Sequence, residues 1–172
     1  MKRLLLTALL SLALPANAAE LTLKNAPAQV YFSPNGGAQE AIVQAISKAR
    51  SEVLAQAYTF TSRPIAEALG QAHRRGVRVV VLQDTSQPGE KLTGAARLKE
   101  SGVPVFLDAE HAIAHNKLIV LDGETVITGS FNFTRGAEEK NAENVLIIKD
   151  KALARLYRDN WEEHRAHSAP YR

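Results

Sequence analysis

The stretch HNKLIVLDGETVITGSFNF, residues 115–133, decides how this chain is interpreted, because it combines a strand pattern with an unusual set of polar side chains. Two apolar runs flank the dipeptide Asp122-Gly123, and Asp-Gly between apolar runs is a strong signal for a β-hairpin. The stretch therefore predicts two antiparallel strands joined by a tight turn.

The polar side chains of this hairpin converge if the turn has two residues. Lys117 then lies opposite Thr128 and His115 lies opposite Ser130, and opposed residues share a face of the sheet. Asn132 joins them if the second strand continues. A four-residue loop keeps this grouping, whereas a three-residue loop divides it between the two faces.

Strand and helix patterns alternate on both sides of the hairpin. Apolar runs predict strands at 28–33, 53–60, 77–84, 103–108 and 144–150. Helical spacing predicts helices at 40–50, from 63 to Gly76, at 90–101 with Gly102 as the stop, and around 153–166. This order predicts one α/β domain, a mixed β-sheet with helices on both faces in an α-β-α sandwich.

The first eighteen residues have the pattern of a signal peptide. Lys2 and Arg3 precede an apolar run from Leu4 to Leu14, and Ala16-Asn17-Ala18 matches an A-x-A cleavage site. We expect cleavage after Ala18, a single domain at 19–172, and a periplasmic or secreted protein. The apolar run is short for a bilayer span, so no stable membrane anchor is expected after cleavage.

Composition limits the partners and the chemistry. Loss of Lys2 and Arg3 lowers the basic residues from 21 to 19 against 18 acidic ones, a net charge of +1. Nucleic-acid binding would therefore need a local basic patch, and residues 73–78 are a candidate that also suits a solvated helix end. The sequence has no cysteine, which excludes disulfides, cysteine nucleophiles and cysteine zinc sites.

The polar groups of the hairpin suit phosphoryl transfer. Lys117 and Asn132 can donate hydrogen bonds to phosphate oxygens, and His115 can act as a nucleophile or proton carrier near neutral pH. Such fixed donors can take the place of a metal ion. A metal site is not predicted, because His164 and His167 fall in a polar terminal helix without an H-E-x-x-H motif. No cofactor is expected.

The spacing His115-x-Lys117-x4-Asp122-x6-Gly129-Ser130-x-Asn132 matches the HxKxxxxDxxxxxxGSxN motif without a gap. The chain therefore resembles the phospholipase D superfamily. Residues 57–84 resemble the strand–helix–strand before this motif in small members, and Glu143-Asn144 resembles the acidic element after it. Size, export signal and the single motif are most similar to the small bacterial Nuc-type endonucleases.

The resemblance implies a role for each motif residue. The histidine at position 115 would attack phosphorus and form a phosphohistidine, while a second motif histidine protonates the leaving oxygen and then activates water. Lys117 and Asn132 would hold the phosphate oxygens with help from Ser130. Glu143 would orient a histidine and stabilise its imidazolium.

Other residues near the motif favour structural roles. Asp122 suits the turn itself, and Gly129 suits a close backbone approach. His111 is equally compatible with the site entrance and with no role. The neighbouring aromatic residues favour the core over contacts with bases or with a second subunit: Tyr58, Phe60, Phe131 and Phe133.

The chain carries a single H-x-K motif, whereas the implied mechanism uses two histidines. We therefore expect a homodimer in which two copies share one active site on the two-fold axis. The leading expectation is a metal-independent, nonspecific endonuclease acting on DNA or also RNA. A phospholipase D or cardiolipin-type lipid hydrolase, and a catalytically inactive nucleic-acid- or phosphate-binding protein, remain as alternatives.

Overall fold

The computed structural model describes residues 19–86 and 93–172; the predicted signal peptide at 1–18 and the start of the predicted helix 90–101 lie outside the described residues. The strands are β1 (Ala28–Ser33), β2 (Glu52–Ala57), β3 (Arg78–Asp84), β4 (Val105–Asp108), β5 (Lys117–Leu121), β6 (Thr125–Gly129), β7 (Glu143–Lys149) and β8 (Ala169–Pro170). The helices are α1 (Ala38–Lys48), α2 (Arg63–Arg74), α3 (Thr93–Glu100), α4 (Arg135–Glu139) and α5 (Lys151–His167).

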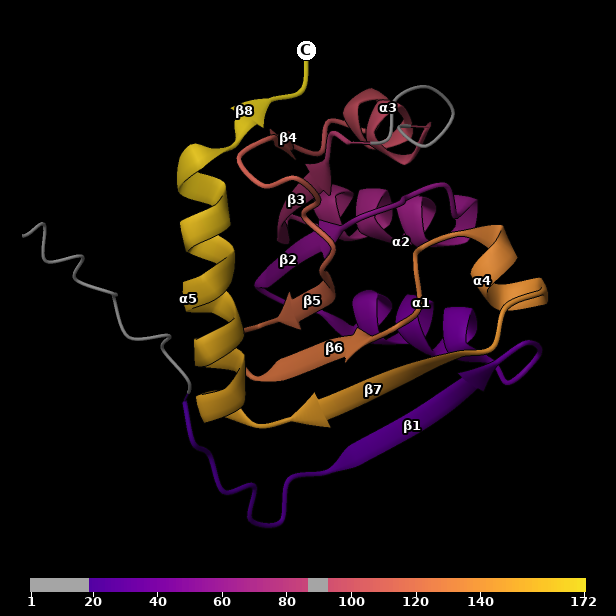
Figure 1. The fold of residues 1–172 in the computed structure, drawn as a ribbon, viewed down its shortest axis with the longest axis vertical. Helices are drawn as coiled ribbons and strands as arrows, with labels where there is room; N and C mark the ends of the chain where they lie inside the picture. Colours follow the sequence, from indigo (N-terminus) through magenta and orange to yellow (C-terminus); the bar gives the residue numbers. More distant parts are fainter. Residues whose placement is uncertain (1–18, 87–92) are drawn as a thin grey trace, which may run out of the picture.

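The eight strands of the described residues form one mixed sheet in the order β1-β7-β6-β5-β2-β3-β4-β8. The neighbours β2, β3 and β4 are parallel, and the other neighbouring pairs are antiparallel. Helices α1, α2 and α3 lie on one face of the sheet and α5 crosses the other (Figure 1). The predicted α/β sandwich is confirmed. The polar stretch before Asn144 contains the short helix α4, which apolar periodicity does not reveal.

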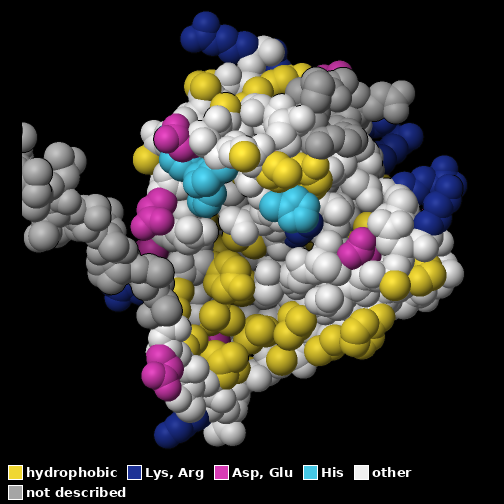
Figure 2. Space-filling model, in the orientation of Figure 1, with side chains coloured by type: hydrophobic (Ala, Val, Ile, Leu, Met, Phe, Trp, Pro, Cys, Tyr) yellow, Lys and Arg dark blue, Asp and Glu magenta, His cyan; other side chains and the backbone are white. Residues whose placement is uncertain are grey.

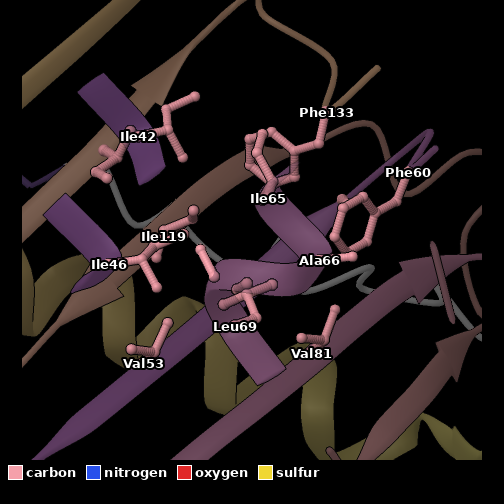
Figure 3. Packing of buried hydrophobic residues seen from close by; sticks show 14 of the residues in the cluster. Ile42, Ile46, Val53, Phe60, Ile65, Ala66, Leu69, Val81, Ile119 and Phe133 are labelled. Carbon is pink, nitrogen blue, oxygen red and sulfur yellow. The ribbon is translucent and has the colours of Figure 1, made fainter. Parts of the chain in front are cut away.

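The larger core lies between the sheet and the helices α1 to α3. Ile42 and Ile46 of α1 and Leu69 of α2 point toward sheet residues such as Val53 and Ile119 (Figure 3), and all five are fully buried. Helix α2 begins where its sequence predicts, with Ser62 as the cap that accepts a hydrogen bond from the Ile65 amide.

The smaller core lies under α5. Trp161 is fully buried there, and its Nε1 donates a hydrogen bond to the Ala55 carbonyl at 2.9 Å. Further along the sheet, Val30 and Phe32 of β1 stay 53% and 64% exposed. Val30 pairs with Leu146 of β7, whose register places both on the α5 side of the sheet. We call Val30, Phe32 and Leu146 the apolar shelf (Figure 2, lower edge of the view).

In residues 19–86 and 93–172, no helix combines the length and the apolar character needed to cross a bilayer.

Candidate active site

An open cavity of about 460 Å³ lies where β5 begins and β6 ends. It collects the five side chains for which the sequence predicts phosphate chemistry, although they come from three separate segments. None of the described residues that line it is large and apolar. The lining residues are His115, Asn116, Lys117, Thr128, Gly129, Ser130, Asn132 and Glu143.

His115 and Lys117 are held side by side at this cavity. The Lys117 Nζ donates a hydrogen bond to the carbonyl oxygen of His115 at 2.6 Å. The ring of Tyr58, which follows β2, packs against the His115 ring at 4.5 Å between centroids and lies 5.1 Å from Lys117 Nζ. Tyr58 therefore borders the site, and the prediction that it belongs to the core is wrong.

Lys117 is buried, with a residue exposure of 8%. Burial lowers the pKa of Lys117 below its usual value, while the carboxylates of Glu143 and Asp84 act in the opposite direction. A buried cation beside an open polar cavity is poised to bind an anion, because little hydration has to be removed from it.

Ser130 and Glu143 form the opposite wall of the cavity. The Ser130 hydroxyl donates to Glu143 Oε2 at 2.5 Å and accepts from the Asn144 amide at 3.1 Å. Asn141 Nδ2 donates to the other carboxylate oxygen at 3.1 Å. Among the described residues, no hydrogen bond joins Glu143 to a histidine, so its contacts here orient Ser130.

Gly129 allows this wall to form. A Cβ at this position would lie 2.2 Å from the carbonyl oxygen of Asn144, and its φ of +150° is unusual for other residues. The close approach brings the end of β6 against the start of β7, where Ser130 meets Asn144.

Asn132 carries an unused polar atom. Its side-chain Oδ1 is buried and has no hydrogen-bond partner among the described residues. Since the two ends of an amide exchange when it flips, this position can offer an acceptor or a donor to a ligand in the cavity.

The register of the hairpin corrects the expected geometry. Asp122 and Gly123 do form the turn, with φ values of 52° and 64°. However, Leu121 pairs with Thr125, so Glu124 is an extra residue in the connection. Lys117 and Thr128 are therefore not opposite each other, and the motif residues converge at the strand ends rather than along one face.

Asp122 lies at the far end of β5 and does not line the cavity. Its carboxylate accepts hydrogen bonds from the amides of Arg50, Ser51 and Glu52 and from the Ser51 hydroxyl, at 2.8 to 3.1 Å. These contacts tie the turn to the start of β2, which is a structural function.

Asp84 supports the site although its sequence environment did not single it out. This buried carboxylate at the end of β3 accepts a hydrogen bond from the Ala114 amide at 2.6 Å, directly before His115. A carboxylate closing an apolar strand is the signal that could have identified it. His111 does not line the cavity. Three of the aromatic residues are in the core, as the sequence favours: Phe60, Phe131 and Phe133.

A larger hollow of about 650 Å³ lies between α1 and the edge formed by β1 and β7. Its lining includes Tyr31, Lys48 and Asp122 but no histidine among the described residues. Of these two hollows, the smaller one is the candidate active site, because the imidazole, ammonium, hydroxyl and amide groups meet there.

Comparisons with known proteins agree with this geometry. The family described as "Cardiolipin synthase, PLD-like domain" matches residues 42–165. A phospholipase D from Rickettsia typhi is 40% identical over 147 residues, which cover 86% of this chain and 71% of that protein. A mitochondrial cardiolipin hydrolase from Xenopus laevis is 36% identical over 127 residues, covering 72% of this chain and 60% of that protein.

Solved structures show the same fold. Nuc from Salmonella typhimurium, described as a phospholipase D family member, superposes with a TM-score of 0.82 and is 35% identical, covering 86% of this chain and 99% of that one. NucT from Helicobacter pylori has a TM-score of 0.77 at 23% identity, covering 85% and 99%. The chain therefore belongs to the phospholipase D superfamily.

Proposed function

We propose that this protein is an exported endonuclease that hydrolyses DNA, and also RNA, without a metal ion in the reaction. The observation that carries the proposal is the pairing of His115 with Lys117 at an open cavity lined by polar residues and glycine. Such a cavity suits a hydrated phosphodiester backbone. The resemblance to Nuc-type endonucleases supports the same substrate class.

The resemblance to the phospholipase D superfamily implies the reaction, and the groups in the cavity suit its steps. A ring nitrogen of His115 attacks phosphorus, the bond to the leaving oxygen breaks, and a second histidine donates a proton to that oxygen. Lys117 and Asn132 hold the non-bridging oxygens, with the Ser130 hydroxyl close by. Water then attacks the phosphohistidine, gives its proton to the second histidine and releases His115.

The second histidine would come from another copy of the chain. Each chain has one H-x-K motif, and the apolar shelf lies beside the cavity. Phe32 pairs with Asn144, whose side-chain amide donates to Ser130 at 3.3 Å. A two-fold related copy would cover the shelf and bring its histidine to the shared site.

A lipid phosphodiester is the second candidate substrate. Relatives are named phospholipase D and mitochondrial cardiolipin hydrolase, and the exposed side chains of Val30 and Phe32 could contact acyl chains. We favour nucleic acid because the cavity itself offers acyl groups no apolar wall among the described residues.

Parallel assays on plasmid DNA, RNA and phosphatidylcholine, each in EDTA, test the proposal. Nuclease activity that persists in EDTA is expected. Lipid turnover without nuclease activity would identify a lipid as the substrate instead. Activity abolished by EDTA in a protein that circular dichroism shows to be folded would contradict the metal-free reaction. His115→Asn should remove turnover and keep the circular dichroism of the folded protein; the same variant with full activity would exclude His115 as the nucleophile.

A further inference from the structure

Three histidines and one aspartate converge at a second place, outside the cavity. Asp108 ends β4 with a fully buried carboxylate, His111 follows it, and His164 and His167 lie one turn apart at the end of α5. One donor atom from each of the four lies within 4.8 Å of the others. In Figure 2 this group appears as the histidine cluster beside the upper part of α5.

The contacts within this histidine cluster centre on the carboxylate. His164 Nδ1 lies 2.5 Å from Asp108 Oδ2, and His167 Nε2 lies 3.2 Å from Oδ1. His111 Nδ1 is 3.6 Å from Oδ1, which is beyond a hydrogen bond. Its ring centroid is 4.8 Å from that of His164 and 5.4 Å from that of His167.

We propose that Asp108, His111, His164 and His167 form a binding site for Zn²⁺. If Asp108 served only to hold α5 through hydrogen bonds, His164 and His167 would be explained, because both of them bond to its carboxylate. This role does not explain His111, whose imidazole approaches the other two rings without a hydrogen bond to the carboxylate. A cation bound between the three imidazoles and the carboxylate would explain the positions of all four side chains.

The donor set selects the metal. Three imidazole nitrogens and one carboxylate oxygen suit tetrahedral Zn²⁺, whereas Mg²⁺ and Ca²⁺ prefer oxygen ligands. Zinc–nitrogen bonds of about 2.0–2.1 Å need donors roughly 3.4 Å apart, so the group has to contract. The His111 side chain is 48% exposed, which leaves it free to move inward and gives the ion an entry path.

The ion would connect parts of the chain that are distant in sequence. It would tie the end of α5 to the loop 109–116, which leads directly to His115. None of the four ligands lines the catalytic cavity. The site would therefore stabilise the fold and hold the loop, and it takes no part in the proposed reaction.

Zinc titration of the untagged full-length protein, freed of metal with EDTA and then desalted, tests this site. Calorimetry should give one Zn²⁺ per chain, and the melting temperature should rise by about 5–10 °C at a hundredfold excess over the dissociation constant. Co²⁺ should produce the intense visible absorption of a tetrahedral site, and Mg²⁺ should have no effect.

Variants locate the ion. His111→Ala and His167→Ala, which alter partly exposed side chains, should each weaken zinc binding by on the order of tenfold or more and reduce the thermal shift. His73→Ala, a histidine of α2 outside the cluster, is the matched control and should bind like the wild type. Wild-type zinc binding in both cluster variants, loss of binding only in His115→Asn, or no stoichiometric uptake would each overturn the proposal.

Discussion

Replacing Asp122 with alanine should destabilise the fold and leave the chemistry intact, although Asp122 is part of the family motif. The carboxylate accepts hydrogen bonds from four donors on Arg50, Ser51 and Glu52. The reaction groups lie at the opposite end of β5, about 16 Å away by the rise of a strand.

The magnitude follows from these contacts. Each bond to a charged acceptor contributes at most about 1.5–3 kcal/mol, and water can replace part of it at this partly exposed turn. We therefore assign roughly 2–3 kcal/mol to the hydrogen bonds and about 1 kcal/mol to an alanine at a φ of 52°. The melting temperature should fall by about 6–15 °C.

The assay compares Asp122→Ala with two controls. Asp122→Asn keeps an acceptor and tolerates the left-handed backbone, so it should lose only about 1 kcal/mol. Asp159→Ala removes an exposed aspartate of α5 and should match the wild type. Denaturant unfolding gives stability, and diester hydrolysis well below the melting temperature gives activity. A stable Asp122→Ala protein without activity would refute the structural assignment.

Three further outcomes are expected. Burial depresses the pKa of Lys117, so the folded protein loses this proton at a pH below the ordinary 10.5. As the pH rises through that folded-state pKa towards 10.5, kcat/KM should fall, while the free energy of unfolding should rise because the unfolded chain still binds the proton. Lys117→Arg should move the loss of activity to higher pH. Gly129→Ala should cost about 1–3 kcal/mol in denaturant unfolding, because its Cβ meets the Asn144 carbonyl. Phe32→Asp should raise the dissociation constant of the proposed dimer roughly 10- to 100-fold by sedimentation, with specific activity falling on dilution. An unchanged pH profile, unfolding free energy or dissociation constant would contradict the structural reasoning behind the respective prediction.

Much of the fold could be predicted because its signals are local. The continuous apolar run of β3 indicates a strand buried on both faces, and its residues 79–84 are all buried. Ser62 and Pro64 mark the start of α2 through capping chemistry that acts within one turn. Such signals need no knowledge of distant segments.

The hairpin register could not be predicted, because contacts outside the hairpin hold it. The Asp122 amide bonds to the Glu52 carbonyl at 2.9 Å, and Glu124 forms an ion pair with Lys149 at 2.9 Å. Both partners are far along the chain. The motif residues still converge, since pairing ends at Gly129 and the segments beyond it turn toward the cavity.

The histidine cluster was missed for the same reason. The spacing of His164 and His167 predicts that they share a helix face. No local pattern indicates that this face meets the end of β4. Asp108 and His111 lie there, more than fifty residues before His164 in the sequence.

The pairing of β1 with β7 has a consequence for how the protein folds during its synthesis. Ala28 pairs with Ile148, so β1 finds its neighbour only after another 120 residues (148 − 28) have been synthesised. Closing so long a loop is slow relative to local folding. Glu143 also belongs to β7. A nascent chain therefore contains His115 well before it contains the Glu143 wall of the cavity. Hydrolytic activity should therefore be absent from chains that end before β7.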